Sequence, residues 1–326
     1  MIITRTPLRI SYIGGGSDFF EFMGNQIGNV VGATIDQFVY VAINKLSDIA
    51  NENLRFTYRQ TESVQDFTDI QHPVLRALAE KLDLKERLNI ATFADLPAGA
   101  GLGGSSSFTA GLIKAIFEFR GEQISPEMIA QIAIDVERIK LKEGGGIQDQ
   151  YHASIGGFRH YAFQNGQAKF STPLIPEGSL HYLENRQVLF WSGESRASSG
   201  FAKVTAKKAQ SDSSTITAIS QLALKTSERL RSSSSPSEHY SIIAEAVWQG
   251  WKLKRDFTSQ PSKSVEQIVS TSLNCGADAV KLCGAGESGF VLVLAQPDKI
   301  EEIQNSLSGF KSVVPHFTEY GVTRIL

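Results

Sequence analysis

The stretch Pro97-Ala98-Gly99-Ala100-Gly101-Leu102-Gly103-Gly104-Ser105-Ser106-Ser107 decides the fold of this chain. It follows an apolar run over residues 88–96 that is typical of a strand. It precedes apolar residues at helical spacing, namely Phe108, Leu112, Ala115, Ile116 and Phe119. We therefore predict a strand, a glycine loop and a serine-capped amphipathic helix. Such a loop presents free backbone N–H groups and the positive end of the helix dipole, so it predicts a phosphate-binding site.

Two other phosphate-binding motifs match this stretch only in part. Residues 99–104 match G-x-G-x-x-G, but residues 284–289 match it too, between two predicted strands. A dinucleotide site also needs an acid after a second strand about 20 residues on, and residues 118–122 fall in the predicted helix. A Walker loop needs a lysine after its last glycine, where this chain has Ser105. A plain tight turn would not require so many glycines and serines.

Two acidic residues follow on a suggestive layout. A second helix is predicted from Ser125-Pro126 to the glycines at 144–146, with Glu137 near its end and Asp149 just beyond. Both carboxylates can converge on the serines, because Mg²⁺ prefers oxygen ligands and a carboxylate can accept or orient a hydroxyl proton. A solvated Glu137 and an N-capping Asp149 remain the alternative.

Composition limits the function classes. The 326 residues are 41% hydrophobic with a formal net charge of -2, which gives no basic surface for nucleic acid. There is no apolar run of 18 residues and no signal-peptide pattern at the N-terminus, so we expect no membrane contact. Only Cys275 and Cys283 are present, which favours a reducing, cytoplasmic setting. The six histidines lack the paired spacing of a metal site.

The rest of the chain indicates two α+β domains, residues 1–175 and 186–326. The pattern loosens over 165–186, which is where we expect the boundary. A strand at 188–191 then leads into a mostly helical region that runs to about residue 275. Two apolar runs around a glycine turn, a helix from Pro297 and a terminal strand complete the pattern.

Taken together, the segments resemble the GHMP kinases, the superfamily of galactokinase, homoserine kinase, mevalonate kinase and phosphomevalonate kinase. Three signature regions appear in order: residues 6–18 (TPLRISYIGGGSD), residues 96–107, and residues 281–292 (KLCGAGESGFVL). Residues 146–150 (GIQDQ) are similar to the segment that carries the catalytic aspartate of galactokinase. The branch it resembles is that of bacterial sugar kinases typified by D-glycero-D-manno-heptose 7-phosphate kinase. The resemblance implies a ribosomal-protein-S5-like N-terminal domain and a ferredoxin-like C-terminal domain.

The resemblance also implies a role for each matching residue. Asp149 and Arg9 would be catalytic, and Ser105 and Glu137 would hold Mg²⁺. The ATP phosphates would bind to Pro97, Gly99, Gly101, Leu102, Gly103, Gly104, Ser105, Ser106 and Ser107. The substrate would bind to Gly15, Gly16, Ser17, Asp18, Arg196, Gly284 and Gly286.

The function implied is an ATP- and Mg²⁺-dependent sugar kinase that phosphorylates an anomeric hydroxyl, with heptose 7-phosphate as the expected acceptor. Another sugar of the fucose or galactose type, a superfamily decarboxylase and a catalytically silent sugar- and nucleotide-binding regulator are the alternatives. Glu287 and Ser288 stand where small residues are usual in the third region, which bears on the substrate more than on the chemistry. Partners would be ATP and a small sugar or sugar phosphate, and a homodimer stays open.

Overall fold

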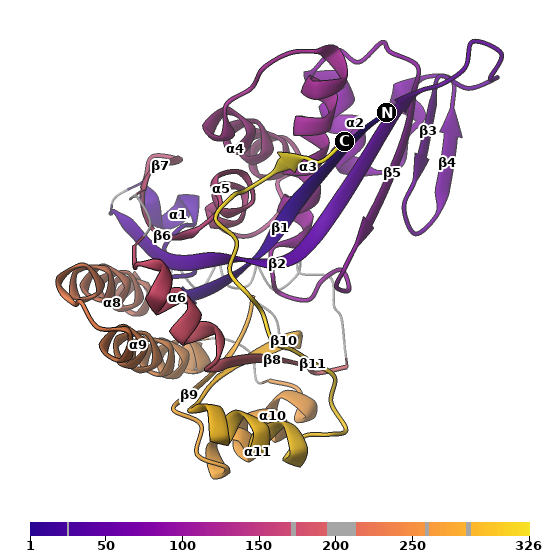
Figure 1. Cartoon of the computed structure of the whole chain (residues 1–326). Helices are drawn as coiled ribbons and strands as arrows, with labels where there is room; N and C mark the ends of the chain where they lie inside the picture. Colours follow the sequence, from indigo (N-terminus) through magenta and orange to yellow (C-terminus); the bar gives the residue numbers. More distant parts are fainter. Residues whose placement is uncertain (25, 171–173, 194–212, 258–260, 285–287) are drawn as a thin grey trace.

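The computed structural model describes residues 1–24, 26–170, 174–193, 213–257, 261–284 and 288–326. Within these ranges the strands form two sheets (Figure 1). Strands and helices are mixed without a regular parallel repeat, which confirms the predicted α+β class.

The larger sheet has the order β12-β1-β2-β5-β3-β4, and β6 and β7 extend it from the other end of β2. Its strands in the described ranges are β1 (Ile2–Ile13), β2 (Gly28–Lys45), β3 (Leu54–Thr57), β4 (Thr61–Val64), β5 (Leu88–Ala94), β6 (Phe158–Gln164), β7 (Gln167–Phe170) and β12 (Thr323–Arg324). All neighbours are antiparallel except β3 and β5. The long strand β2 joins the sheet together, because its first half pairs with β6 and its second half with β5.

Helices cover one face of this sheet (Figure 1). They are α1 (Phe20–Met23), the short 3₁₀ turn η1 (Phe67–Asp69), α2 (Pro73–Lys81), α3 (Gly104–Arg120), α4 (Pro126–Ile134), the π-helical turn η2 (Asp135–Lys140) and α5 (Gln148–Ile155). Helix α3 packs directly on β1 and β2 and also touches α4 and α5. Its middle is fully buried, so the phosphate loop at its start is held on the rigid core of the molecule.

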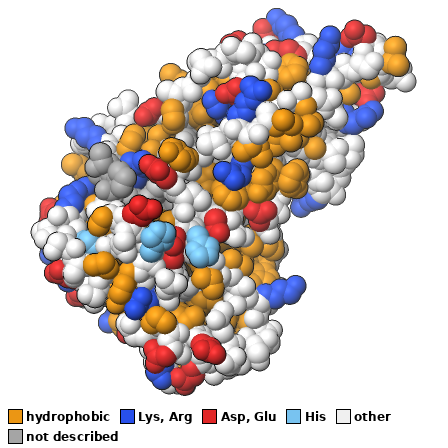
Figure 2. Space-filling view, viewed as in Figure 1, with side chains coloured by type: hydrophobic (Ala, Val, Ile, Leu, Met, Phe, Trp, Pro, Cys, Tyr) orange, Lys and Arg blue, Asp and Glu red, His pale blue; other side chains and the backbone are white. Residues whose placement is uncertain are grey.

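The opposite face of the larger sheet carries aromatic side chains, of which Phe93 is exposed and Phe38 and Tyr40 are half-buried. Tyr40 stacks on Phe93 with ring centroids 4.9 Å apart, and Arg5 lies over the ring of Phe38. Figure 2 shows the hydrophobic side chains gathered over this sheet on the viewed side. This face lies away from the helices that carry the phosphate loop.

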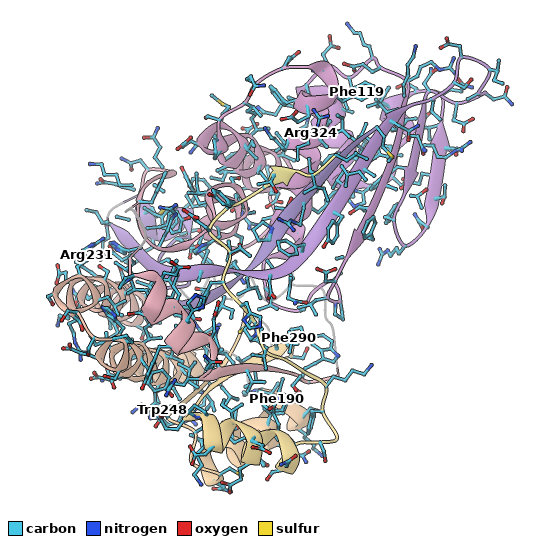
Figure 3. All side chains as sticks on the ribbon, in the orientation of Figure 1. Phe119, Phe190, Arg231, Trp248, Phe290 and Arg324 are labelled. Carbon is cyan, nitrogen blue, oxygen red and sulfur yellow. The ribbon has the colours of Figure 1, made fainter. Side chains whose placement is uncertain are left out.

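The smaller sheet has the order β11-β8-β10-β9 and is wholly antiparallel. Its elements are α6 (Glu177–Glu184), β8 (Gln187–Trp191), α8 (Ser213–Ser232), α9 (Pro236–Phe257), α10 (Lys263–Asn274), β9 (Ala279–Leu282), β10 (Phe290–Leu294), α11 (Pro297–Ser306) and β11 (Ser312–Val313). Phe190 packs with residues of α10 and α11, whereas Phe290 belongs to the main core on the other side (Figure 3). Both faces of the smaller sheet are therefore buried.

Both ends of the chain meet in the larger sheet (Figure 1). β12 pairs with β1, and the Ile3 backbone N–H donates to the Leu326 carbonyl at 3.0 Å. The division into residues 1–175 and 186–326 stays a prediction. None of the helices in the described part of the chain is both long and apolar enough to cross a lipid bilayer.

Three local expectations differ from the structure. The N-cap of α3 is Gly103, in the left-handed region, and no side chain caps the helix. The second helix begins after Ser125 as predicted, but it widens into a π-helical turn and ends at Lys140, before the glycines. Asp149 lies inside the first turn of α5, whose N-cap is Ile147, so it does not cap that helix.

Candidate active site

One pocket brings most of the predicted site residues together. It lies between the phosphate loop, the glycine loop at residues 14–16, the turn at 143–146 and helix α9. The predicted residues that line it are Arg9, Gly15, Gly16, Asp18, Gly99, Gly101, Gly103, Gly104, Ser105, Ser106, Glu137, Asp149 and Gly284. Arg196 and Gly286 lie outside the described residues.

Four predicted residues are described but do not line the pocket: Pro97, Leu102, Ser107 and Ser17. Leu102 is in the core, and its carbonyl accepts from the backbone N–H of Arg9 at 3.0 Å. The Ser107 hydroxyl donates to the Pro7 carbonyl, and the Ser17 hydroxyl donates to the Gly14 carbonyl at 2.7 Å. These side chains hold the loops in shape, while Pro97 is exposed.

The phosphate loop owes its shape to glycine. Gly99, Gly101 and Gly103 have φ values of 73°, 84° and 80°, which residues with a Cβ rarely adopt. The loop ends in the first turn of α3, where Ser105 is exposed and the backbone N–H groups have no helical partner. The positive end of a helix dipole adds to these donors, so this turn can bind an anion such as phosphate.

Arg9 connects the predicted catalytic acid to this loop. Its Nε and one terminal nitrogen donate to the two carboxylate oxygens of Asp149, each at 2.8 Å. The other terminal nitrogen donates to the Gly101 carbonyl at 2.8 Å. This two-pronged pairing fixes the orientation of the carboxylate as well as its position. Asp149 is thereby held beside the place where a phosphate would sit.

Glu137 is fully buried at the back of the pocket. Its carboxylate accepts from the hydroxyls of Ser106 at 2.8 Å and Thr109 at 2.5 Å, and from the side-chain amide of Gln150. The direct contact is thus with Ser106, while the predicted partner Ser105 lines the same pocket from the exposed side of the turn. Glu137 stands on the π-helical turn η2, a kind of irregularity common at functional sites.

A second carboxylate accompanies Glu137. Glu143 also lines the pocket, and burial raises its pKa, with a further rise from the charge of Glu137. In the described part of the chain neither carboxylate forms an ion pair with a lysine or arginine. No third His, Cys, Asp or Glu joins them within the described ranges. Two carboxylates beside serine hydroxyls suit Mg²⁺, which binds few protein oxygens and keeps several waters.

Asp18 is held by the backbone. Its carboxylate accepts from the N–H groups of Gly16 at 2.9 Å and Gln148 at 3.0 Å, and burial raises its pKa. A Cβ on Gly146 would lie 1.7 Å from one of its oxygens, so only glycine fits there. Asp18 therefore joins the first glycine loop to the start of α5.

Two buried polar atoms near Asp18 have no partner among the described residues. They are the hydroxyl of Ser11 and the side-chain oxygen of Gln148, and both residues line the pocket. Gly15 lies between them, since a Cβ there would be 3.4 Å from the Gln148 amide nitrogen and 3.6 Å from the Ser11 hydroxyl. Because orphaned buried polar groups cost free energy, this part of the pocket suits a hydroxyl-rich ligand.

Sequence reasoning missed these two residues, Glu143 and two lysines. Lys254 on α9 and Lys281 on β9 both line the pocket. Burial lowers the pKa of Lys254 to about 8 and that of Lys281 to about 7. Lys281 is the first residue of the third signature region and so had a signal nearby, whereas nothing in the helical sequence around Lys254 sets it apart.

The third glycine region lies directly against the phosphate loop. A Cβ on Gly284 would be 2.6 Å from the Cα of Gly101, and the Phe290 N–H donates to the Ala100 carbonyl at 3.1 Å. The Ser288 hydroxyl is buried with no partner among the described residues. Glu287 lies outside the described residues.

Comparison with known proteins fits this geometry. Residues 70–157 match the family model of the GHMP kinases N terminal domain. The chain is 28% identical to a D-glycero-alpha-D-manno-heptose 7-phosphate kinase of Campylobacter jejuni, over 97% of this chain and 96% of the relative.

Two solved structures share the whole fold. One is a D-glycero-D-manno-heptose 1-phosphate kinase from Bacteroides thetaiotaomicron, with a TM-score of 0.80 at 22% identity, covering 100% of this chain and 99% of that one. The other is a sugar kinase from Campylobacter jejuni, with a TM-score of 0.74 at 26% identity, covering 99% and 97%. Residues 70–157 thus carry the N-terminal domain of the GHMP kinases, and the chain is a phosphotransferase with an alcohol group as acceptor.

Proposed function

We propose that this kinase transfers the γ-phosphate of ATP to the anomeric hydroxyl of D-glycero-D-manno-heptose 7-phosphate and releases the 1,7-bisphosphate and ADP. The observation that carries the proposal is the group formed by Arg9, Asp149 and the Gly101 carbonyl at the start of α3. It sets a carboxylate beside a loop of free N–H groups, and phosphoryl transfer asks a protein mainly for position and charge stabilisation. The choice of heptose rests on the full-length similarity to the Campylobacter kinase.

In the proposed mechanism the acceptor hydroxyl lies against Asp149 and loses its proton to that carboxylate. The hydroxyl oxygen forms a bond to the γ-phosphorus while the bond from that phosphorus to the β–γ bridging oxygen breaks, and ADP leaves with the electron pair. Arg9 keeps the carboxylate pointed at the hydroxyl and lies close to the negative charge that develops. The N–H groups of the phosphate loop and the first turn of α3 bind the phosphate oxygens.

Glu137 and Glu143, with Ser105 and Ser106, are the residues we propose to hold Mg²⁺. When bound, Mg²⁺ would neutralise charge on the β- and γ-phosphates. Ser11, Gln148 and Asp18 are proposed to face the sugar, because two of them carry unpartnered buried oxygens. We further propose that the enzyme works in the cytoplasm, which its two free cysteines favour.

An ADP-release assay with Mg²⁺ tests the chemistry and the acceptor together. We expect turnover with heptose 7-phosphate that exceeds turnover with fucose, galactose or mevalonate. Activity with one of those acceptors and none with heptose 7-phosphate would overturn the choice of sugar. Acceptor screening also separates a kinase from a decarboxylase of the same superfamily.

Asp149→Asn tests the catalytic role and the silent-regulator alternative. Removing a positioned general base costs about 10²–10⁴-fold in rate, while ATP binding should persist because Asp149 does not touch the proposed Mg²⁺ ligands. Unchanged turnover in the variant would show that Asp149 has another role. Absence of ADP release from the wild-type enzyme with every acceptor would favour the regulator.

A further inference from the structure

Two lysines from the C-terminal half of the chain line the pocket. Lys281 on β9 is 7% exposed, and its Nζ donates to the backbone carbonyls of Ser11 and, at 2.8 Å, Tyr12. Lys254 on α9 donates to the Gly284 carbonyl. Both line the pocket that contains Arg9 and Asp149.

The charges of these lysines are not balanced by acids in the part of the chain that the structure describes. Arg9 has Asp149 as its partner, but neither Lys254 nor Lys281 forms an ion pair there, and each bonds only to backbone carbonyls. Burial is the main cause that lowers the pKa of each ammonium group, and the charge of Lys254 lowers the pKa of Lys281 further. Buried charges are normally paired, so this pair indicates a place for an anion.

The remaining donors match one phosphate group. An ammonium has three N–H donors. Lys281 uses two of them on carbonyls and Lys254 uses one, which leaves about three N–H groups for a ligand. The terminal oxygens of a phosphate monoester number three, and its dianion matches the charge of the two ammonium groups.

The location of the two lysines favours the phosphate of the acceptor sugar over the phosphates of ATP as their ligand. Lys281 bonds to the end of β1 immediately before the first glycine loop, and Ser11 on that segment carries one of the orphaned hydroxyls. Lys254 lies one helical turn after Gly250. A Cβ on Gly250 would lie 2.1 Å from the Ile13 side chain. Lys281 thus adjoins the segment that we propose to face the sugar, and Lys254 lies on α9, which packs on β1, and bonds to Gly284. The phosphate loop has its own N–H donors at the start of α3.

We propose that Lys254 and Lys281 form the subsite that receives the phosphate monoester of a phosphorylated sugar acceptor. This inference rests on the proposed sugar-kinase function and deepens it, because it explains how the enzyme selects a sugar phosphate over a free sugar. The ester phosphate binds between the two ammonium groups, and the sugar extends from there toward Asp149.

The test compares Lys254→Met and Lys281→Met with Lys252→Met. Lys252 is on the same helix, but its side chain is exposed and lies over the ring of Trp248. A hydrogen bond to a charged group contributes about 1.5–3 kcal/mol, so each pocket variant should raise KM for heptose 7-phosphate about 10–150-fold. KM for ATP and for unphosphorylated heptose should change little, and Lys252→Met should behave like wild type.

Two results would overturn the proposal. A rise in KM for ATP alone would assign the lysines to the nucleotide phosphates. An equal loss of activity with phosphorylated and unphosphorylated heptose would assign them a structural role. If Lys281→Met does not fold, Lys254→Met decides, since its Nζ has a single carbonyl partner.

A binding measurement separates this proposal from the proposed function. Sulfate is titrated calorimetrically into enzyme that is saturated with Mg²⁺ and a non-hydrolysable ATP analogue, so that the phosphate loop is filled. Binding that is lost in the lysine variants and kept in Lys252→Met supports the subsite even if no sugar is phosphorylated. Equal sulfate binding by wild type and both lysine variants overturns the subsite even if the enzyme is an active kinase.

Discussion

Glu137 shows how a single residue depends on its neighbours. Its charge is fully buried, yet its three hydrogen-bond partners, Ser106, Thr109 and Gln150, are all neutral. Such a carboxylate retains a strong attraction for a cation in the pocket. The proposed Mg²⁺ site depends on that attraction more than on the number of ligands.

Glu137→Gln should therefore weaken the Mg²⁺ dependence of ATP binding. The amide has the same shape but no charge, so a fluorescent ATP analogue should need about tenfold or more Mg²⁺ to reach the same affinity, which corresponds to about 1.4 kcal/mol. Binding without Mg²⁺ should stay as in wild type or improve slightly. Glu122→Gln, at an exposed position after α3, is the control. An unchanged Mg²⁺ titration in Glu137→Gln would contradict the proposed metal role.

The two lysines predict a pH dependence for sulfate binding, since sulfate keeps its charge throughout the range. The pKa is lowered to about 7 for Lys281 and to about 8 for Lys254. Arg9 and Cys283 also face this pair, and burial raises the pKa of the Cys283 thiol, so it stays neutral near pH 7. Below pH 7 both ammonium groups are charged and the affinity is greatest.

Affinity for sulfate should then fall as pH rises from about 7 to 9. Above the pKa of each lysine, that lysine should contribute a loss of roughly tenfold in affinity per pH unit. Calorimetry at several pH values, with the Mg²⁺-loaded ATP analogue present, measures this fall. Lys254→Met should have weaker binding and a shallower dependence. A constant affinity from pH 6 to 9 in wild type would show that neither lysine titrates against the bound anion.

At the scale of elements, the catalytic loops interlock through glycines. A Cβ on Gly101 would lie 2.6 Å from the Cys283 carbonyl, and one on Gly284 would approach Gly101 equally closely. The phosphate loop and the third glycine region are thus packed backbone to backbone. Gly121 also has a positive φ of 72°, but a Cβ there would meet nothing within 4 Å.

Substitutions at Gly121 and Gly101 distinguish backbone strain alone from strain combined with steric crowding between the two loops. Gly121→Ala should cost about 1–2 kcal/mol of unfolding free energy through strain alone. Gly101→Ala should cost more, and it should also weaken ATP binding, because the two loops must move apart. Urea unfolding and ATP titration of both variants measure the difference. Equal unfolding free energies and equal ATP affinities in the two variants would contradict the interlocking of the loops.

The sequence predicted these elements unevenly, for physical reasons. The strand, glycine loop and helix around residues 97–107 were predicted because the periodicity and the glycines are local signals. The π-helical turn at Glu137 was not, since six residues are too few for apolar spacing to distinguish a π-helical turn from an α-helical one. Ser11, Gln148 and Lys254 were missed because only tertiary packing turns them toward the pocket.

At the scale of the whole molecule, the pocket collects residues from both halves of the chain. Arg9, Asp149 and Glu137 come from elements of the larger sheet and its helices, whereas Lys254 and Lys281 come from α9 and β9. Helix α9 packs on both β1 and β9, which brings the two sets together. The α+β class follows from local patterns, but this convergence depends on contacts far apart in the sequence, such as Lys281 with Ser11.

The glycines clustered at four loops of the sequence fall at the walls of this one pocket, in residues 14–16, 99–104, 144–146 and 284. Backbone N–H groups and a few placed cations can hold anionic substrates there, so the net charge of the chain can stay near zero.

The most direct test of the account is phosphorus NMR of the product formed from ATP, Mg²⁺ and a panel of sugars and sugar phosphates. We predict a new phosphate resonance coupled to the anomeric proton of heptose 7-phosphate, together with one ADP per product and no such signal in Asp149→Asn. A product phosphorylated at a non-anomeric hydroxyl, or ATP left intact with every acceptor in the panel, would contradict it.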